Sequence, residues 1–312
     1  MNSLATVESN SLAEQQGLSA ELFARWVAYL DAKPKTVDTY TKAIRQFFVY
    51  LSDHGITHPT REDIIAYREY LKKEHKPTTV QNYLTATKLF FQWTEQEGIY
   101  DNVAARVKGA KIDKEHKKDY LTSKQVAKLL KSIDRSTLKG KRDYAMLSLM
   151  TTTGLRTISI IRADVGDVRT AGDAVALYYQ GTGHEEKADY VKLAEPVEEA
   201  IRDYLNARGT TDATAPLFSS VAHRNTGGRM TTRSISRVVK DSFIAIGLNS
   251  DRLTAHSLRH TTATLNLLNG GTIEETKQLL GHQNINTTMI YSHALERAKN
   301  NSESRVAKAI FG

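Results

Sequence analysis

The sequence predicts a mainly α-helical protein of two domains, the second of which carries one small antiparallel β-sheet. Three observations support this prediction. The chain has 312 residues, and at roughly 150 residues per domain this length favours two domains. Helical periodicity dominates from residue 20 onward. Strand-forming residues gather in two short runs, 174–180 and 188–194, on either side of a glycine-containing turn.

We expect four segments along the chain. Residues 1–19 are polar and without pattern, so we expect a disordered tail. A helical domain follows over 20–105. Residues 106–119 are basic and lack a continuous apolar face, which indicates an interdomain linker. The second domain then covers 120–312 and ends in a C-terminal tail helix.

An internal repeat defines two helices of the first domain. Residues 33–56 and 76–99 match at ten of 24 positions. Each copy has proline near its start and glycine just past its expected end, where helices favour these residues. One copy alone cannot bury its apolar face, so we expect the two copies to pack in a helical bundle.

The polar residues at the repeated helix starts are candidates for contacts to phosphate groups. A plain helical bundle that binds no ligand fits the same pattern. The candidates are Lys35, Thr36, Thr39, Thr78, Thr79 and Gln81.

The second domain opens with a helix capped at residue 122 or 123, and a strongly apolar helix follows at 142–156. Beyond the two expected strands, periodicity predicts four more helices. They cover 195–208, 231–246, 256–269 and 273–280.

Basic residues are concentrated in the second half of the chain. The net charge is +8, yet residues 1–110 hold 13 basic and 13 acidic side chains. Residues 106–142 hold 13 basic against four acidic side chains, and 224–240 contain no acid. Such clusters are typical of proteins that bind nucleic acids, although a solvated surface can be basic by accident. The candidate DNA contacts here are Lys111, Lys117, Lys118, Arg229, Arg233 and Arg237.

Composition excludes several classes of protein. The absence of cysteine excludes disulfides, thiol catalysis and thiolate metal sites. No apolar run approaches the roughly 20 residues that a membrane span needs, and the N-terminus lacks the pattern of a secretory signal. We therefore expect a cytoplasmic, nucleoid-associated protein with no membrane partner. The histidines of the second domain have no carboxylate at ligand spacing, so we expect no metal and no cofactor.

Four segments of the second domain hold unusual polar residues: TGLR, HSLRH, LLGH and TTMIYSH. Each segment alone is a weak signal, because an arginine or histidine often has a structural role. Their order and spacing together are far more specific. The residues concerned are Arg156, His256, Arg259, His260, His282 and Tyr291.

In this order and spacing, these motifs resemble the tyrosine recombinase family, which includes phage integrases and Xer-type recombinases. The resemblance covers about residues 20–300. It implies a SAM-like core-binding domain followed by a catalytic domain with the DNA breaking-rejoining enzyme fold.

The resemblance also implies a function and partners. The activity would be site-specific DNA recombination without metal or ATP, serving integration or excision of a mobile element or DNA resolution. The expected partners are double-stranded DNA with inverted-repeat core sites and further copies of the chain. They would form a tetramer on DNA with the C-terminal helix exchanged between protomers, and an accessory directionality factor could take part.

By the same resemblance, Tyr291 attacks the scissile phosphate and leaves a 3′-phosphotyrosine and a free 5′-hydroxyl. A phenol with a pKa near 10 is almost fully protonated at neutral pH, so neighbouring groups must favour its anion. Arg156 and Arg259 can present forks of donors to the non-bridging oxygens. His256 is suited to assist proton transfer near the tyrosine, and His282 to donate to a phosphate oxygen.

Two departures from the family pattern bear on activity. Ser159 stands where the family usually has glutamate. Thr182 stands at the usual position of a lysine that acts as general acid, so Lys187 or His184 in the same turn is expected to supply the proton. His260, beside Arg259, is a candidate either for direct contact with the phosphate or for a structural role, and we expect it to pack or to support its neighbours. The alternatives are a DNA-binding relative with weakened catalysis and a type IB topoisomerase-like nicking-closing enzyme.

Overall fold

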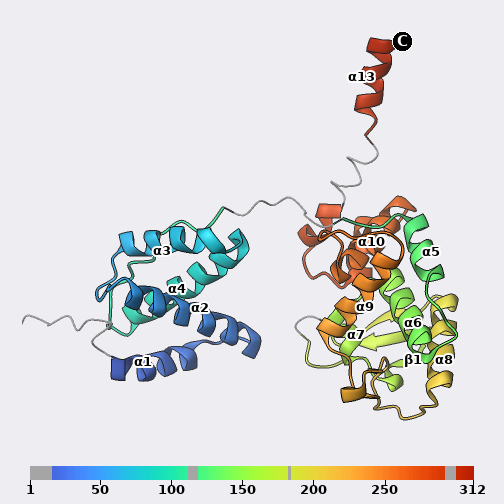
Figure 1. Ribbon diagram of the computed structural model, residues 1–312, viewed down its shortest axis with the longest axis horizontal. Helices are drawn as coiled ribbons and strands as arrows, with labels where there is room; N and C mark the ends of the chain where they lie inside the picture. The colour runs from blue at the N-terminus through green and yellow to red at the C-terminus, as the bar shows by residue number, and fades with distance from the viewer. Residues whose placement is uncertain (1–15, 112–118, 182–183, 292–299) are drawn as a thin grey trace, which may run out of the picture. The chain divides into compact units, whose positions relative to one another are not determined.

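The structure of the protein is a computed structural model that describes residues 16–111, 119–181, 184–291 and 300–312 (Figure 1). The chain divides into two compact units, residues 1–115 and 116–312. Both are built mainly from helices, and the second contains a small antiparallel sheet, which confirms the predicted fold class. The expected tail at 1–19 lies largely outside the described residues. No helix in the described part of the chain is long and apolar enough to cross a membrane.

In the residues that the structure describes, the first unit is a bundle of four helices. They are α1 (Gln16–Tyr29), α2 (Pro34–Asp53), α3 (Arg61–Glu74) and α4 (Pro77–Gln96).

The repeated sequence forms α2 and α4, which pack against each other. Each of these helices has proline in its first turn. Phe47 of α2 and Phe91 of α4 are fully buried, and their ring centroids lie 5.9 Å apart. The repeat therefore supplies both sides of one aromatic core, as its apolar pattern predicted.

The predicted linker begins too early at residue 106, because the next residues pack on the first unit. Val107 is 1% exposed and belongs to the core of that unit. The backbone N–H of Ala110 donates to Oε1 of Gln81 at 3.1 Å. Arg68 donates to the carbonyl oxygen of Lys108 at 2.9 Å. The segment is charged and lacks a periodic apolar pattern, so its sequence does not indicate these contacts.

The described part of the second unit contains a three-stranded sheet, with helices before and after it along the chain. Its elements before the sheet are α5 (Ser123–Lys131), α6 (Leu138–Thr153), α7 (Thr157–Arg162) and η1 (Val165–Asp167). The strands are β1 (Val168–Ala171), β2 (Ala174–Tyr179) and β3 (Asp189–Lys192). After the sheet come α8 (Glu195–Arg208), η2 (His223–Asn225), α9 (Thr232–Ala245), α10 (Ala255–Leu268), α11 (Ile273–Leu280), a helical stretch over 286–291, and α13 (Ser302–Phe311).

The sheet has the order β1-β2-β3, with both pairs antiparallel. The hairpin of β2 and β3 matches the two predicted strands. The sequence reading missed β1, because this four-residue strand is only partly buried and shows no apolar alternation.

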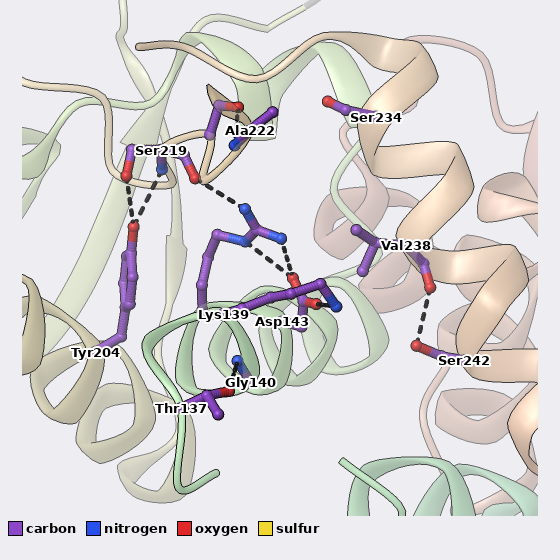
Figure 2. A network of polar contacts seen from close by, with 12 residues as sticks. Thr137, Lys139, Gly140, Asp143, Tyr204, Ser219, Ala222, Ser234, Val238 and Ser242 are labelled. Atoms are coloured by element: carbon purple, nitrogen blue, oxygen red, sulfur yellow. Dashed lines mark hydrogen bonds and ion pairs between the residues drawn. The ribbon is translucent and has the colours of Figure 1, made fainter. Parts of the chain in front are cut away.

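Helix α6 packs against α8 and α10 at the centre of the second unit. Its buried Arg142 donates to Oδ1 of Asp143 at 2.9 and 2.6 Å and to the carbonyl oxygen of Ser219 at 3.1 Å. The hydroxyl of Tyr204 on α8 points at Ser219, 2.9 Å from its Oγ (Figure 2). These contacts satisfy a buried ion pair and fix α6, whose C-terminal end leads into the predicted Arg156 motif.

Candidate active site

A cleft of about 390 Å³ in the second unit brings together three of the predicted catalytic residues. Its wall is formed by the segment after α6, the face of α9 and the start of α10. The lining residues are Leu155, Arg156, Thr157, Ile158, Ser236, Thr254, Ala255, His256 and Arg259. Two arginines and a histidine thus share one open cavity, which suits an anionic ligand.

A tight turn at the end of α6 places Arg156. Helix α6 ends at Gly154, which adopts a left-handed conformation with φ of 64°. A Cβ here would lie 2.6 Å from a side-chain carbon of Leu280, so only glycine fits the turn. Leu155 is then buried, and Arg156 is the extended N-cap residue of α7. The glycine of the TGLR motif therefore directs the arginine toward the cleft.

Arg259 is buried on α10 and joins two segments of the site. Its Nη1 donates to the carbonyl oxygen of Gly154 at 2.7 Å, and its Nη2 donates to that of Leu280 at 2.6 Å. Burial and the charge of Arg156 lower the pKa of Arg259 to about 10. The guanidinium stays protonated at neutral pH, and the shift shows that the two arginine charges act on each other. A bound phosphate would relieve this repulsion.

His282 follows Gly281, the left-handed residue that ends α11. Its ring Nδ1 lies 2.9 Å from Oγ1 of the buried Thr288. Burial lowers the pKa of His282 to about 4, and the charges of Arg259 and Arg156 act in the same direction. The ring is therefore neutral at physiological pH. In the tautomer that accepts from Thr288 at Nδ1, Nε2 carries a hydrogen and can donate it.

Tyr291 is 3% exposed and lies in the helical stretch 286–291. Its ring is parallel to that of His282, with centroids 6.5 Å apart, and meets the ring of His260 at 4.9 Å and 67°. Burial raises the pKa of Tyr291, while the charges of Arg259 and Arg156 oppose this effect. The phenol is thus protonated at rest but lies in the field of both arginines.

The hairpin residues have other partners than expected. Nζ of Lys187 donates to Oδ2 of Asp164 at 2.6 Å and to Oδ2 of Asp167 at 2.5 Å. Burial lowers the pKa of Lys187, but the hydrogen bonds to these two carboxylates outweigh burial, and the net shift is upward. Lys187 is therefore held in ion pairs in this structure. Thr182 lies outside the described residues, and His184 Nδ1 is 3.4 Å from Asp189.

The candidate DNA contacts of the first unit differ in exposure and in whether they already have partners within the protein. Lys35 is highly exposed and pairs with Asp38, while Thr39 donates to the carbonyl oxygen of Lys35. Gln81 already accepts from Ala110 and so has a structural role. The other described candidates, all exposed or half-buried, are Thr36, Thr78, Thr79 and Lys111.

In the second unit, Arg233 and Arg237 are exposed on α9. Arg229 instead donates to the carbonyl oxygens of Ile161 and Ala163 and pairs with Asp164. Its contacts hold the loop against the rest of the unit. Lys117 and Lys118 lie outside the described residues.

The structure brings three further residues to the site. Thr288 and Tyr179 were not predicted from the sequence, and His260 was predicted only as a supporting residue. Thr288 binds His282, and the polar run before Tyr291 gave the only hint of it. Tyr179 is buried near the same turn: a Cβ on Gly281 would lie 2.9 Å from its hydroxyl. His260 was expected to pack, and it is in ring contact with Tyr291. Within the described residues, no group of three or more potential metal ligands comes together.

Comparison with known protein families gives two matches along the chain. Residues 119–297 match the phage integrase family. Residues 21–101 match the N-terminal SAM-like domain of phage integrases.

Several curated proteins are similar to the chain. Tyrosine recombinase XerC of Herpetosiphon aurantiacus is 30% identical over 283 residues, which cover 86% of this chain and 89% of that protein. XerC of Actinobacillus pleuropneumoniae serotype 7 is 34% identical over 198 residues, 64% of this chain. The match spans only 61% of that relative, and a match to XerC of Pelobacter propionicus spans 48%.

Solved structures share the fold. The XerH recombinase bound to palindromic difH substrate, in a post-cleavage complex, matches with a TM-score of 0.72 and 19% identity, covering 94% of this chain and 84% of that one. A dimer of a lambda integrase fragment bound to a COC′ core site matches with a TM-score of 0.67 and 18% identity, covering 86% and 96%.

Proposed function

The chain belongs to the phage integrase family, and from this premise we propose that it is a site-specific DNA recombinase. It would cleave and rejoin DNA strands through a 3′-phosphotyrosine intermediate. The observation that supports this most is the meeting of Arg156, Arg259, His282 and Tyr291, which come from four separate segments.

The proposed chemistry begins with binding of the scissile phosphate. Arg156 and Arg259 lie at the cleft and act on each other electrostatically, so an anion between them is favoured. Their donors would hold the non-bridging oxygens, where charge develops in the transition state. Neutral His282 would donate a further hydrogen bond to the phosphate.

Tyr291 would then attack phosphorus as the bond to the 5′ oxygen breaks. The covalent phosphotyrosine keeps the bond energy, so rejoining needs no ATP. In this scheme His256 at the rim of the cleft assists proton transfer. Lys187 could protonate the leaving oxygen only after separating from Asp164 and Asp167, so we propose this role for a rearranged hairpin.

The proposal extends to assembly and location. We propose that the chain acts in the cytoplasm at the nucleoid, on double-stranded DNA with inverted-repeat core sites. Four copies would assemble on DNA, with an accessory factor setting direction. Helix α13 buries no residue, and its Val306, Ile310 and Phe311 are exposed, as expected of a helix that docks on a neighbouring protomer.

A nicked suicide substrate tests the function. Loss of a short strand beyond the cleavage site traps the covalent complex, which a denaturing gel detects. The wild-type protein should give this complex, and Tyr291→Phe should give none while binding DNA as before. A surviving covalent band in the variant would show that another residue is the nucleophile.

The two alternatives leave different signatures in the same assays. A relative with weakened catalysis would bind DNA but give no covalent complex. A nicking-closing enzyme would relax supercoiled plasmids that lack any specific site.

A further inference from the structure

His260 is a buried, titratable side chain that the scheme above does not use. It is 2% exposed and lies on α10 one turn after His256. Its ring meets that of Tyr291 at a centroid distance of 4.9 Å and that of His256 at 4.9 Å and 81°. His256 is exposed at the cleft. The three rings therefore follow one another from the buried phenol to the exposed His256.

The phenol needs a proton acceptor inside the protein. Burial keeps Tyr291 protonated, so its attack on phosphorus must release a proton. His282 is the other ring beside the phenol, but its centroid lies 6.5 Å away and its Nδ1 already contacts Oγ1 of Thr288, whereas the ring of His260 lies at 4.9 Å. His260 is the remaining imidazole in ring contact with Tyr291 among the described residues.

We propose that His260 accepts the proton of Tyr291 and passes it to His256. As Oη of Tyr291 bonds to phosphorus, the bond from phosphorus to the 5′ oxygen breaks. The phenolic proton moves to a ring nitrogen of His260 and then to His256, which exchanges it with water. The leaving 5′ oxygen takes up one proton from Lys187 of the rearranged hairpin, and Lys187 regains a proton from solvent, so protons balance. This inference depends on the proposed function, because it requires Tyr291 to be the nucleophile.

The charges of the site favour movement of the proton outward. Arg156 and Arg259 disfavour an additional positive charge nearby, as their effect on His282 shows. An imidazolium at the buried His260 would feel the same field and little solvation. An imidazolium at the exposed His256 is hydrated, so the second transfer runs downhill.

The first test compares rates of covalent complex formation on a suicide substrate. His260→Phe keeps an aromatic ring of similar shape but has no nitrogen, and His260→Gln keeps a hydrogen-bonding group that is not a base. We expect both variants to cleave roughly 100-fold more slowly, with DNA affinity unchanged. His58→Phe, at an exposed histidine of the first unit, is the matched control and should cleave at the wild-type rate.

The second test separates proton transfer from packing. Tyr291 is replaced by 3,5-difluorotyrosine, whose phenol is more acidic and ionises without a base. In this background the defect of His260→Phe should shrink at least about tenfold. A defect of unchanged size, or a His260→Phe rate equal to wild type, would overturn the inference while leaving Tyr291 as the nucleophile. No covalent complex from the wild-type protein would overturn the proposed function and this inference with it.

Discussion

Replacing Arg259 with lysine keeps the charge of the site but removes the planar fork of donors. In the structure this fork binds the carbonyl oxygens of Gly154 and Leu280. The two acceptors belong to the turn before Arg156 and the turn before His282. One ammonium group cannot bind both carbonyls and a phosphate in the same geometry.

The expected cost follows from these contacts. A buried carbonyl left without a donor costs about 1–3 kcal/mol, which lowers the Tm of a unit of this size by roughly 2–12 °C. Loss of one charge-assisted bond to the phosphate costs about 1.5–3 kcal/mol, which corresponds to cleavage roughly 10- to 150-fold slower.

Thermal unfolding and suicide-substrate kinetics measure the two effects on the same preparations. Arg237→Lys, an exposed arginine of α9, is the control for the same chemical change and should leave the Tm unchanged. A Tm for Arg259→Lys within a degree of wild type would refute the structural part of the reasoning. A cleavage rate within about twofold of wild type would refute the role of the fork in transition-state binding.

Three further predictions concern DNA binding, the tail helix and pH. DNA affinity should fall steeply with salt, with a log–log slope of roughly −5 or steeper for six or more phosphate contacts; a slope near −1 in a titration would show that the basic clusters do not touch DNA. Deleting 303–312 should leave the Tm and single-site DNA binding unchanged, because α13 buries no residue. The deletion should impair tetramer formation on two-site DNA, measured by native mass spectrometry. Unchanged tetramers would exclude exchange of this helix. Burial raises the pKa of Asp164, but hydrogen bonds from Lys187 and Arg229 outweigh it and hold the pKa below its ordinary value. The stability from this carboxylate is therefore present above its unfolded pKa of about 3.9 and lost as pH falls further. Lys187→Met should weaken this acid dependence in unfolding experiments, and an unchanged dependence would contradict the pairing.

Much of the fold could be predicted, because helical periodicity and the prolines and glycines at helix ends are visible in the sequence. The repeat at 33–56 and 76–99 gave two helices and their shared core. Proline at the start and glycine past the end marked the bounds of these two helices. Strand β1 was not predicted because it is short and only partly buried. The start of the linker was misplaced because Val107 and hydrogen bonds at Lys108 and Ala110 fix residues that show no periodic pattern.

The site was harder to predict where a charged side chain can either contact a ligand or form an ion pair within the protein. Arg229 was predicted to contact DNA and Lys187 to act as general acid, yet both bind Asp164. Sequence spacing places His256 and Arg259 on one helix. It does not predict the contact between the rings of His260 and Tyr291. Tyr179 and Thr288 reach the site through folding of distant segments, which leaves no local pattern.

The most direct test of the proposed recombinase chemistry is identification of the covalent bond itself. The trapped protein–DNA complex is digested with protease and nuclease, and the peptide carrying the nucleotide is sequenced by mass spectrometry. The proposed function predicts a 3′-phosphoryl link to Tyr291 and a free 5′-hydroxyl on the released strand. A nucleotide on Tyr179 or any other residue, or a link through a 5′-phosphate, would contradict the account.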